Sequence, residues 1–262
     1  MPVAHLNGIH LHYRDEGPRD GPAVVFSNSL GTDLHLWDSL LPHLRAGLRI
    51  VRYDTRGHGL SDAPPPPYAM GALVTDLERL CDHLDLRDTV LVGISLGGMT
   101  AQALAVKRLD LVRGLVLSNT GAKIGTPALW DDRIESVRTG GLAAQADATV
   151  ARWFARHYRD GPDHIAYRHM FTRTPVDGYT GCSAAISGTD LMAATATLRL
   201  PALAIAGDED DSTPPDMVRE TAALIPGADF ALIRRAGHLP FLEQPAAYAD
   251  ALNRFLDRIN HV

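Results

Sequence analysis

The stretch Thr89-Val90-Leu91-Val92-Gly93-Ile94-Ser95-Leu96-Gly97-Gly98 decides the fold of this chain. Its first four residues form an apolar, β-branched run of the kind found in buried strands, and an apolar helix is expected over 97–109. Between them, the G-x-S-x-G pattern predicts a sharp, strained turn that leaves the serine hydroxyl exposed. Such a turn is unfavourable unless the serine is used. Ser95 is therefore the first candidate for a nucleophile.

A run of acidic residues follows a second strand-like segment. Leu203-Ala204-Ile205-Ala206 is apolar, and Gly207-Asp208-Glu209-Asp210-Asp211 comes directly after it. Four consecutive acids usually form a solvated loop, but open parallel sheets place their sites at the carboxyl ends of strands. We select Asp210 as the candidate acid, with Asp208 and Asp211 as alternatives.

The candidate base lies near the end of the chain. His238 stands between glycine and proline in Arg235-Ala236-Gly237-His238-Leu239-Pro240, after the strand-like run 230–233. This places it in a loop at the end of the last strand, near the expected position of Ser95. A serine turn between strand and helix, followed by an acid and then a histidine, predicts a catalytic triad of Ser95, Asp210 and His238.

Composition narrows the class of protein. A chain of 262 residues can bury a sizeable core, and 45% hydrophobic with 21% charged residues is ordinary for a globular protein. The net charge of -6 and the lack of a Lys/Arg run argue against nucleic acid as a partner. Two cysteines make no disulfide framework, and neither a secretory signal nor a membrane segment is expected. A reduced, cytoplasmic protein is the expectation.

Strand and helix signals alternate along most of the chain. A hairpin is expected about Asn7-Gly8, and Met70 to Leu84 carries apolar residues at helical spacing. Together these signals predict an α/β fold, a mostly parallel twisted sheet with helices on both faces. Further short strands are expected at 23–27, 49–53 and 114–118.

The pattern changes between residues 120 and 198. Strand signals vanish there, and helical stretches are expected at 130–137, 144–157 and 164–172. We therefore divide the chain into a core, residues 1–119 and 199–262, and a helical cap, residues 120–198. A helical cap over Ser95 would exclude water and shape the pocket.

The chain resembles the α/β-hydrolase superfamily along nearly its whole length, and more narrowly the 3-oxoadipate enol-lactonases of the β-ketoadipate pathway. The resemblance implies a cap inserted after the sixth strand, no cofactor, and hydrolysis of a small carboxylated enol-lactone in aromatic catabolism. No acid follows strand 114–118 before Asp131, so the alternative acid position of this fold looks empty, which favours Asp210. The segments that carry the narrower resemblance are Ser27-Asn28-Ser29-Leu30-Gly31-Thr32-Asp33, Asp54-Thr55-Arg56-Gly57-His58-Gly59-Leu60-Ser61, Gly93-Ile94-Ser95-Leu96-Gly97-Gly98-Met99 and Ala143 to Phe154.

The resemblance also implies roles for backbone groups. The N–H groups of Leu30 and Leu96 would form the oxyanion hole that stabilises the tetrahedral intermediate. Most relatives carry a His-Gly pair where this chain has Asn28-Ser29, and this change leaves the donor at Leu30 in place. Arg56 and His58 are expected to brace the loop after the fourth strand. No metal site is expected, because His58 has no partner at ligand spacing.

The carboxylate of such a substrate needs a cationic partner, and the cap offers Arg133, Arg152 and Arg168. We select Arg133, with Trp153 as the aromatic residue of the pocket and Trp130 as its alternative.

Two other functions stay open. One is a cofactor-free esterase of the haloperoxidase type, which usually carries methionine where this chain has Leu96. The other is a hydrolase-fold receptor for a small lactone, which would show slow turnover and an apolar patch on its cap. The sequence leaves the oligomeric state open.

Overall fold

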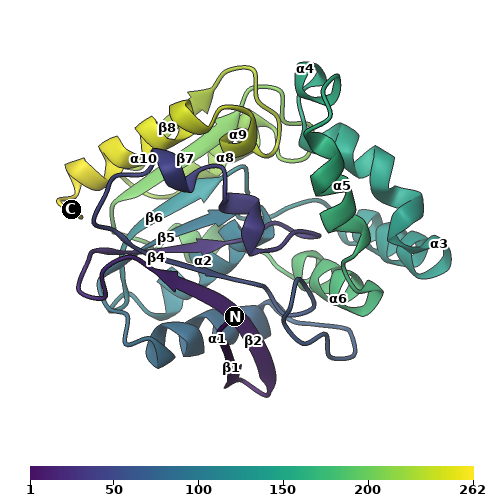
Figure 1. Ribbon diagram of the computed structural model, residues 1–262, viewed down its shortest axis with the longest axis horizontal. Helices are drawn as coiled ribbons and strands as arrows, with labels where there is room; N and C mark the ends of the chain where they lie inside the picture. Colours follow the sequence, from purple (N-terminus) through teal and green to yellow (C-terminus); the bar gives the residue numbers. More distant parts are fainter.

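The computed structural model describes residues 1–262 and contains one eight-stranded sheet with helices around it (Figure 1). The strand order is β1-β2-β4-β3-β5-β6-β7-β8, in which β2 is antiparallel to both of its neighbours, β1 and β4, and all later neighbours are parallel. The predicted α/β fold is therefore confirmed. The strands are β1 Val3–Leu6, β2 Ile9–Glu16, β3 Ala23–Ser27, β4 Arg49–Tyr53, β5 Thr89–Ile94, β6 Val112–Ser118, β7 Ala202–Gly207 and β8 Asp229–Ile233.

The central strands are buried on both faces. Every residue of β3, β5 and β7 is buried, although alternate side chains of a strand point to opposite faces of its sheet. Helices must therefore cover both faces, as parallel sheets require. The helices outside the cap are η1 Leu34–Trp37, η2 Leu41–His43, α1 Met70–His83, α2 Leu96–Lys107, α8 Pro215–Ala223, α9 Pro240–Glu243 and α10 Pro245–Arg258.

The hairpin at the start of the chain follows from its turn residues. Leu6 pairs with Ile9, and the turn residues Asn7 and Gly8 have φ angles of 50° and 76°. Positive φ at both positions is what a type I′ turn needs, and Asn-Gly adopts it readily. The predicted hairpin is confirmed.

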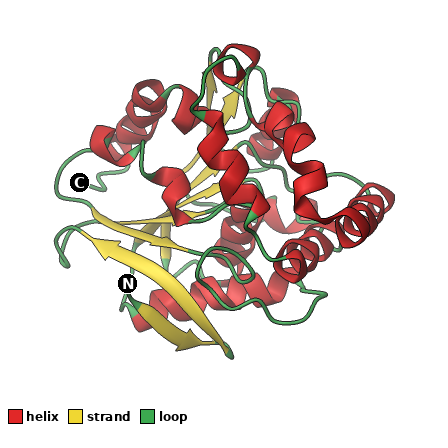
Figure 2. Cartoon of the chain, turned by 45° about the vertical axis from the view of Figure 1, so that its right-hand side comes forward, coloured by secondary structure: helices red, strands yellow, loops and turns green.

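Five helices separate β6 from β7, and α3, α4, α5 and α6 among them lie to the right in Figure 1 (compare Figure 2). The longest, α3, is broken at Gly141, whose φ of 69° and ψ of 172° are not helical. Helix α3 packs against α5 and α6. The five are α3 Pro127–Trp153, α4 Arg156–Arg159, α5 His164–Thr172, α6 Val176–Ser187 and α7 Met192–Thr195.

Two details of this region differ from the sequence prediction. The helix expected over 144–157 ends at Trp153, because Phe154 is extended at φ -119° and ψ 140°. Helix α6 was not predicted, since Gly178 and Gly181 lower helix propensity. The structure gives Gly178 a packing reason, because a Cβ there would lie 1.9 Å from the carbonyl oxygen of Gly57. None of the helices combines the length and hydrophobicity that a membrane crossing requires.

Candidate active site

The turn between β5 and α2 is strained, as its sequence predicts. Ser95 has φ 53° and ψ -117°, a conformation that is unfavourable for a residue with a side chain. Its neighbours must be small, because a Cβ on Gly93 would lie 2.3 Å from the oxygen of Gly97. A Cβ on Gly97 would in turn lie 2.1 Å from the oxygen of Ser27. The close approach of strand and helix therefore holds Ser95 in this conformation.

Asp210 and His238 meet beside this turn. Asp210 follows β7, His238 lies between β8 and α9, and Nδ1 of His238 is 2.9 Å from Oδ2 of Asp210. Ser95 and His238 line the same cavity. The Ser95–His238 hydrogen bond is not formed in the structure, and neither Ser95 Oγ nor His238 Nε2 has another protein partner. Catalytic hydrogen bonds often tighten only when substrate is bound.

Asp210 is the best-supported of the predicted acids. Its carboxylate also accepts hydrogen bonds from Asn119 Nδ2 at 2.8 Å, from Thr213 Oγ1 at 2.7 Å and from the N–H of Ser212 at 2.7 Å. Burial alone would raise the pKa of Asp210, but the charge and hydrogen bonds of His238, Asn119 and Thr213 hold it below the usual range. Asp210 therefore stays ionised beside His238.

The two alternative acids lie elsewhere. Asp208 accepts a hydrogen bond from the N–H of Ala236, and Asp211 is exposed at the cavity rim. Neither contacts His238. Asn119 was missed by sequence reasoning, and its signal was its place directly after β6, the alternative acid position. An amide there supports the acid on β7.

The two predicted oxyanion donors flank the serine turn. Leu96 is the first residue of α2, so its N–H has no acceptor within the helix. The N–H of Leu30, in the loop after β3, has no acceptor either. The next N–H along, that of Gly31, donates to Nε2 of His58 at 2.9 Å, while Nδ1 of His58 lies 3.1 Å from the oxygen of Arg56. Burial lowers the pKa of His58 and keeps it neutral. His58 therefore has a structural role, but it braces the loop after β3 as well as its own loop after the fourth strand.

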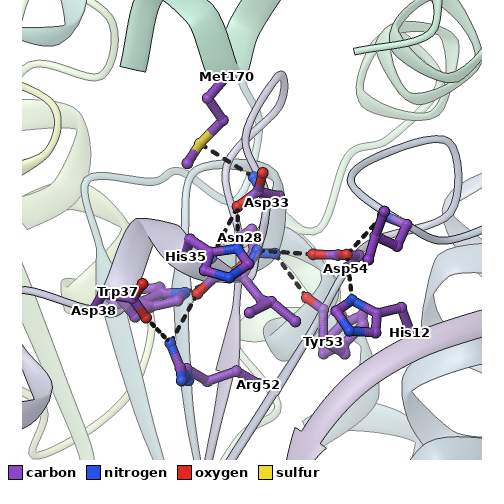
Figure 3. Close-up of polar contacts among 12 residues, drawn as sticks. His12, Asn28, Asp33, His35, Trp37, Asp38, Arg52, Tyr53, Asp54 and Met170 are labelled. Carbon is purple, nitrogen blue, oxygen red and sulfur yellow. Dashed lines mark hydrogen bonds and ion pairs between the residues drawn. The ribbon is translucent and has the colours of Figure 1, made fainter. Parts of the chain in front are cut away.

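Asn28 anchors the same loop from below (Figure 3). Its amide donates to the oxygen of Tyr53 at 2.7 Å and accepts from Trp37 Nε1 at 2.8 Å. Asp54 accepts from the N–H of Leu34 at 2.8 Å and pairs with His12 at 2.7 Å. Asn28 therefore has a structural role in this loop.

Arg56 also has a structural partner. Its guanidinium makes two hydrogen bonds of 2.6 Å to the buried carboxylate of Asp76 on α1. A paired, bidentate arginine has no free donor pair for a ligand carboxylate. These contacts agree with the expected bracing role.

The cavity above Ser95 has a volume of about 470 Å³ and is lined by core and cap residues. The predicted pair Arg133 and Trp153 line it, and so do the alternatives Arg152 and Trp130. Arg168 does not, since it pairs with Asp147 at 2.7 Å on the surface. The structure therefore brings two of the three candidate arginines to the cavity.

These two arginines lack acidic partners. No carboxylate lies within 4.0 Å of Arg133 or Arg152, although 23 ion pairs occur in the molecule. The guanidinium of Arg133 lies 5.6 Å from the ring centre of Trp130 and 5.9 Å from that of Tyr179. Burial, and secondarily the charge of Arg133, lowers the pKa of Arg152. An anion in the cavity would relieve this repulsion.

Thr149 adds an unpaired hydroxyl to the same wall. It is 1% exposed, lines the cavity, and its Oγ1 has no hydrogen-bond partner. Buried polar groups nearly always have a hydrogen-bond partner, so an unpaired hydroxyl at a cavity wall indicates that a bound ligand supplies the partner. Sequence reasoning missed Thr149, because a single threonine in a helix carries no pattern.

Comparison with known proteins agrees with the fold. The sequence pattern of the alpha/beta hydrolase family matches residues 24–251, and the chain belongs to this family. It is 32% identical to 3-oxoadipate enol-lactonase 2 of Acinetobacter baylyi, over 99% of this chain and 100% of that protein. The crystal structure of the enol-lactonase from Burkholderia xenovorans LB400 superposes with a TM-score of 0.94 at 38% identity, covering 98% of this chain and 100% of that one. A bromoperoxidase-type relative, BpoC of Mycobacterium tuberculosis, is 28% identical over 94% of this chain and 97% of its own length.

Proposed function

We propose that this protein is an enol-lactonase, which opens the ester bond of a small carboxylated enol-lactone such as 3-oxoadipate enol-lactone. The observation that carries the proposal is the composition of the cavity. It combines Ser95 and the Asp210-bound His238 with Arg133 and Arg152, two cations without a carboxylate partner. Full-length similarity to enol-lactonases supports the same substrate class.

In the proposed reaction, Oγ of Ser95 attacks the lactone carbonyl carbon while Nε2 of His238 takes its proton. Asp210 orients the imidazole and stabilises its charged form. The oxyanion accepts hydrogen bonds from the N–H groups of Leu30 and Leu96, each worth about 3–4 kcal/mol by analogy with measured oxyanion-hole donors. When the intermediate collapses, the ring C–O bond breaks and His238 returns the proton to the enol oxygen.

The acyl-enzyme then reacts with water. His238 removes a proton from the water as it attacks the acyl carbon, and the Ser95 oxygen leaves with that proton. The released enol tautomerises to a ketone, which makes the hydrolysis effectively irreversible. No cofactor takes part in these steps.

The cap side of the cavity would hold the substrate carboxylate. Arginine donates two parallel hydrogen bonds to a carboxylate, so Arg133 and Arg152 suit this anion. The Thr149 hydroxyl can add a third donor. Trp153 and Trp130 would pack against the ring and exclude water.

The proposal is tested by following the ultraviolet absorbance of 3-oxoadipate enol-lactone with purified protein, beside p-nitrophenyl acetate as a neutral ester. Ser95→Ala removes the nucleophile, and Ser187→Ala, on α6 and outside the cavity, is the matched control. We expect fast lactone hydrolysis that only the Ser95 variant loses.

The alternative functions give different results in the same assay. Hydrolysis of the neutral ester without the lactone would favour an esterase like the bromoperoxidase-type relatives. Slow turnover of both, with lactone binding retained, would favour a lactone receptor.

A further inference from the structure

The loop that carries His238 is attached to the cap as well as to the core. The N–H of His238 donates to the oxygen of Trp153, the last residue of α3, at 2.8 Å. Gly237 allows this approach, because a Cβ there would lie 2.7 Å from the same oxygen and 2.9 Å from the nitrogen of Ala155. The position of His238 therefore depends on residues 153–155 of the cap.

One carboxylate spans this junction. Oε1 of Glu243, the last residue of α9, accepts the N–H of Gly237 at 2.7 Å, and Oε2 accepts the N–H of Ala155 at 3.0 Å. The first donor precedes His238, and the second follows the end of α3 closely. Only an ionised carboxylate can accept hydrogen bonds with both oxygens and donate none.

This carboxylate has no cation within 4.0 Å. The charged and titratable groups that face it are Glu209, after β7, and Tyr158 and Arg159 on α4. Burial raises the pKa of Glu243 to about 7, against the hydrogen bonds from Gly237 and Ala155. An acid of this kind is unfavourable for the fold when ionised, so its place at the junction calls for a role in function.

We propose that Glu243 is a positioning residue for the hydrolysis proposed above. Its carboxylate holds the His238 loop against the end of α3, and so fixes the base relative to the cavity wall formed by Arg152 and Trp153. The inference rests on the proposed roles of Ser95 and His238. It does not depend on which ester is the natural substrate.

The first test is Glu243→Gln, with Glu220→Gln on α8, an exposed glutamate without an ion pair, as the matched control. The amide keeps one acceptor but places an NH₂ against the second backbone donor. We expect kcat/KM for p-nitrophenyl acetate to fall by about tenfold or more, as expected for a displaced base. Glu220→Gln should equal wild type.

Stability separates positioning from a merely structural role. The folded state binds the Glu243 proton more tightly than the unfolded chain, so wild-type stability falls as pH rises from 4.5 to about 7. The glutamine variant lacks this ionisation. At pH 8 its midpoint of urea denaturation should not lie below that of wild type, although its activity is lower.

The pH profile gives a second readout. Protonation of Glu243 leaves one carbonyl oxygen for two donors, so wild-type kcat/KM should fall more steeply on the acid side than that of Glu243→Gln. A shared slope in the two proteins would contradict the proposal.

A variant of the donor keeps the proposal testable if Glu243→Gln folds poorly. Ala155 has φ -58° and Phe154 before it is extended, so Ala155→Pro fits the backbone angles. The substitution removes the N–H and puts the ring Cδ against Oε2 of Glu243, which therefore loses its contact with this position. We expect lower activity from Ala155→Pro alone and little further loss when it is added to Glu243→Ala. Additive losses would overturn the proposal.

The activities of Ser95→Ala and Glu243→Gln together distinguish a wrong role for Glu243 from a wrong proposed function. If Ser95→Ala keeps full activity, the mechanism itself is wrong. If Ser95→Ala is inactive while Glu243→Gln matches wild type, only the positioning role is wrong. Loss of stability and activity in step would also overturn it, because Glu243 would then serve the fold alone.

Discussion

The core side and the cap side of the cavity differ in how far the protein itself provides partners for their charged and hydrogen-bonding side chains. On the core side, Asp210 is surrounded by hydrogen-bond donors and His58 uses both ring nitrogens. On the cap side, Arg133 and Arg152 have no carboxylate partner, and the Thr149 hydroxyl has no hydrogen-bond partner. The acid, and through it the base, are therefore fixed in advance, as catalysis by preorganisation requires. The recognising groups are left for the substrate to satisfy.

The largest expected effect is a loss of kcat on the core side of the cavity that leaves ligand binding on the cap side unchanged. His238→Ala should lower kcat by about 10⁶-fold, as removal of a triad base does. Binding of glutarate, a small dicarboxylate, should be unchanged, because Arg133 and Arg152 remain. Ester hydrolysis and isothermal titration measure the two quantities. Loss of glutarate binding would show that the two sides are not independent.

The next effect lies within the core side. Asp210→Asn should lower kcat by about 10⁴-fold, because the amide favours the wrong tautomer of His238. Asp208→Asn, two residues away and without contact to His238, is the control and should keep most activity. Comparable losses of kcat in both variants would show that Asp210 is wrongly assigned as the acid of the triad.

Removing one of the two arginines of the cap should weaken binding of the lactone without changing the rate of ester hydrolysis. Arg133→Gln or Arg152→Gln should raise KM for the lactone by about 10- to 100-fold, the value of a charged hydrogen bond. Kinetics with neutral p-nitrophenyl acetate should hardly change. Arg168→Gln is the matched control, since Arg168 pairs with Asp147 outside the cavity. Equal losses of activity with the lactone and with p-nitrophenyl acetate would show that the arginines have a structural role and do not bind the substrate carboxylate.

The smallest expected effect concerns the unpaired hydroxyl of Thr149. Thr149→Val keeps the shape and removes an unpaired polar group, so the free energy of unfolding should rise by about 1 kcal/mol. Lactone binding should weaken several-fold. Thr180→Val is the control, because its hydroxyl donates to the oxygen of Val176 at 2.9 Å. Urea denaturation measures the first effect, and a loss of stability in Thr149→Val would mean that its hydroxyl is satisfied in solution.

The same division explains what could be predicted from the sequence. The turn at Ser95 and the loops after β7 and β8 are local, so short patterns place Ser95, Asp210 and His238 at one edge of the sheet. Their catalytic roles stay predictions until the variants are measured. The hairpin and the parallel sheet follow from similarly local signals.

The cap residues could not be placed in this way. Arg152 was considered but not selected. The sequence predicts two helical stretches on either side of the break at Gly141, but no local pattern gives the angle between them, and the orientation of Arg152 depends on that angle. Helix α6 was not predicted because its glycines lower helix propensity, and they are there for packing: Gly178 lies against Gly57 and Gly181 against the ring of Tyr68. The role of Asn119 depends on a contact with Asp210, which lies 91 residues further along the chain.

The break at Gly141 has a consequence for how such a pocket can change. In an uninterrupted helix, Arg133 and Arg152 would stand about 28 Å apart, too far to serve one small molecule. A backbone conformation open only to glycine turns the helix back, so that both arginines line one cavity. The spacing of the two charges is therefore set by one hinge, remote from Ser95. Residues inserted or deleted beside Gly141 could retune which acids are accepted and leave the hydrolytic machinery intact.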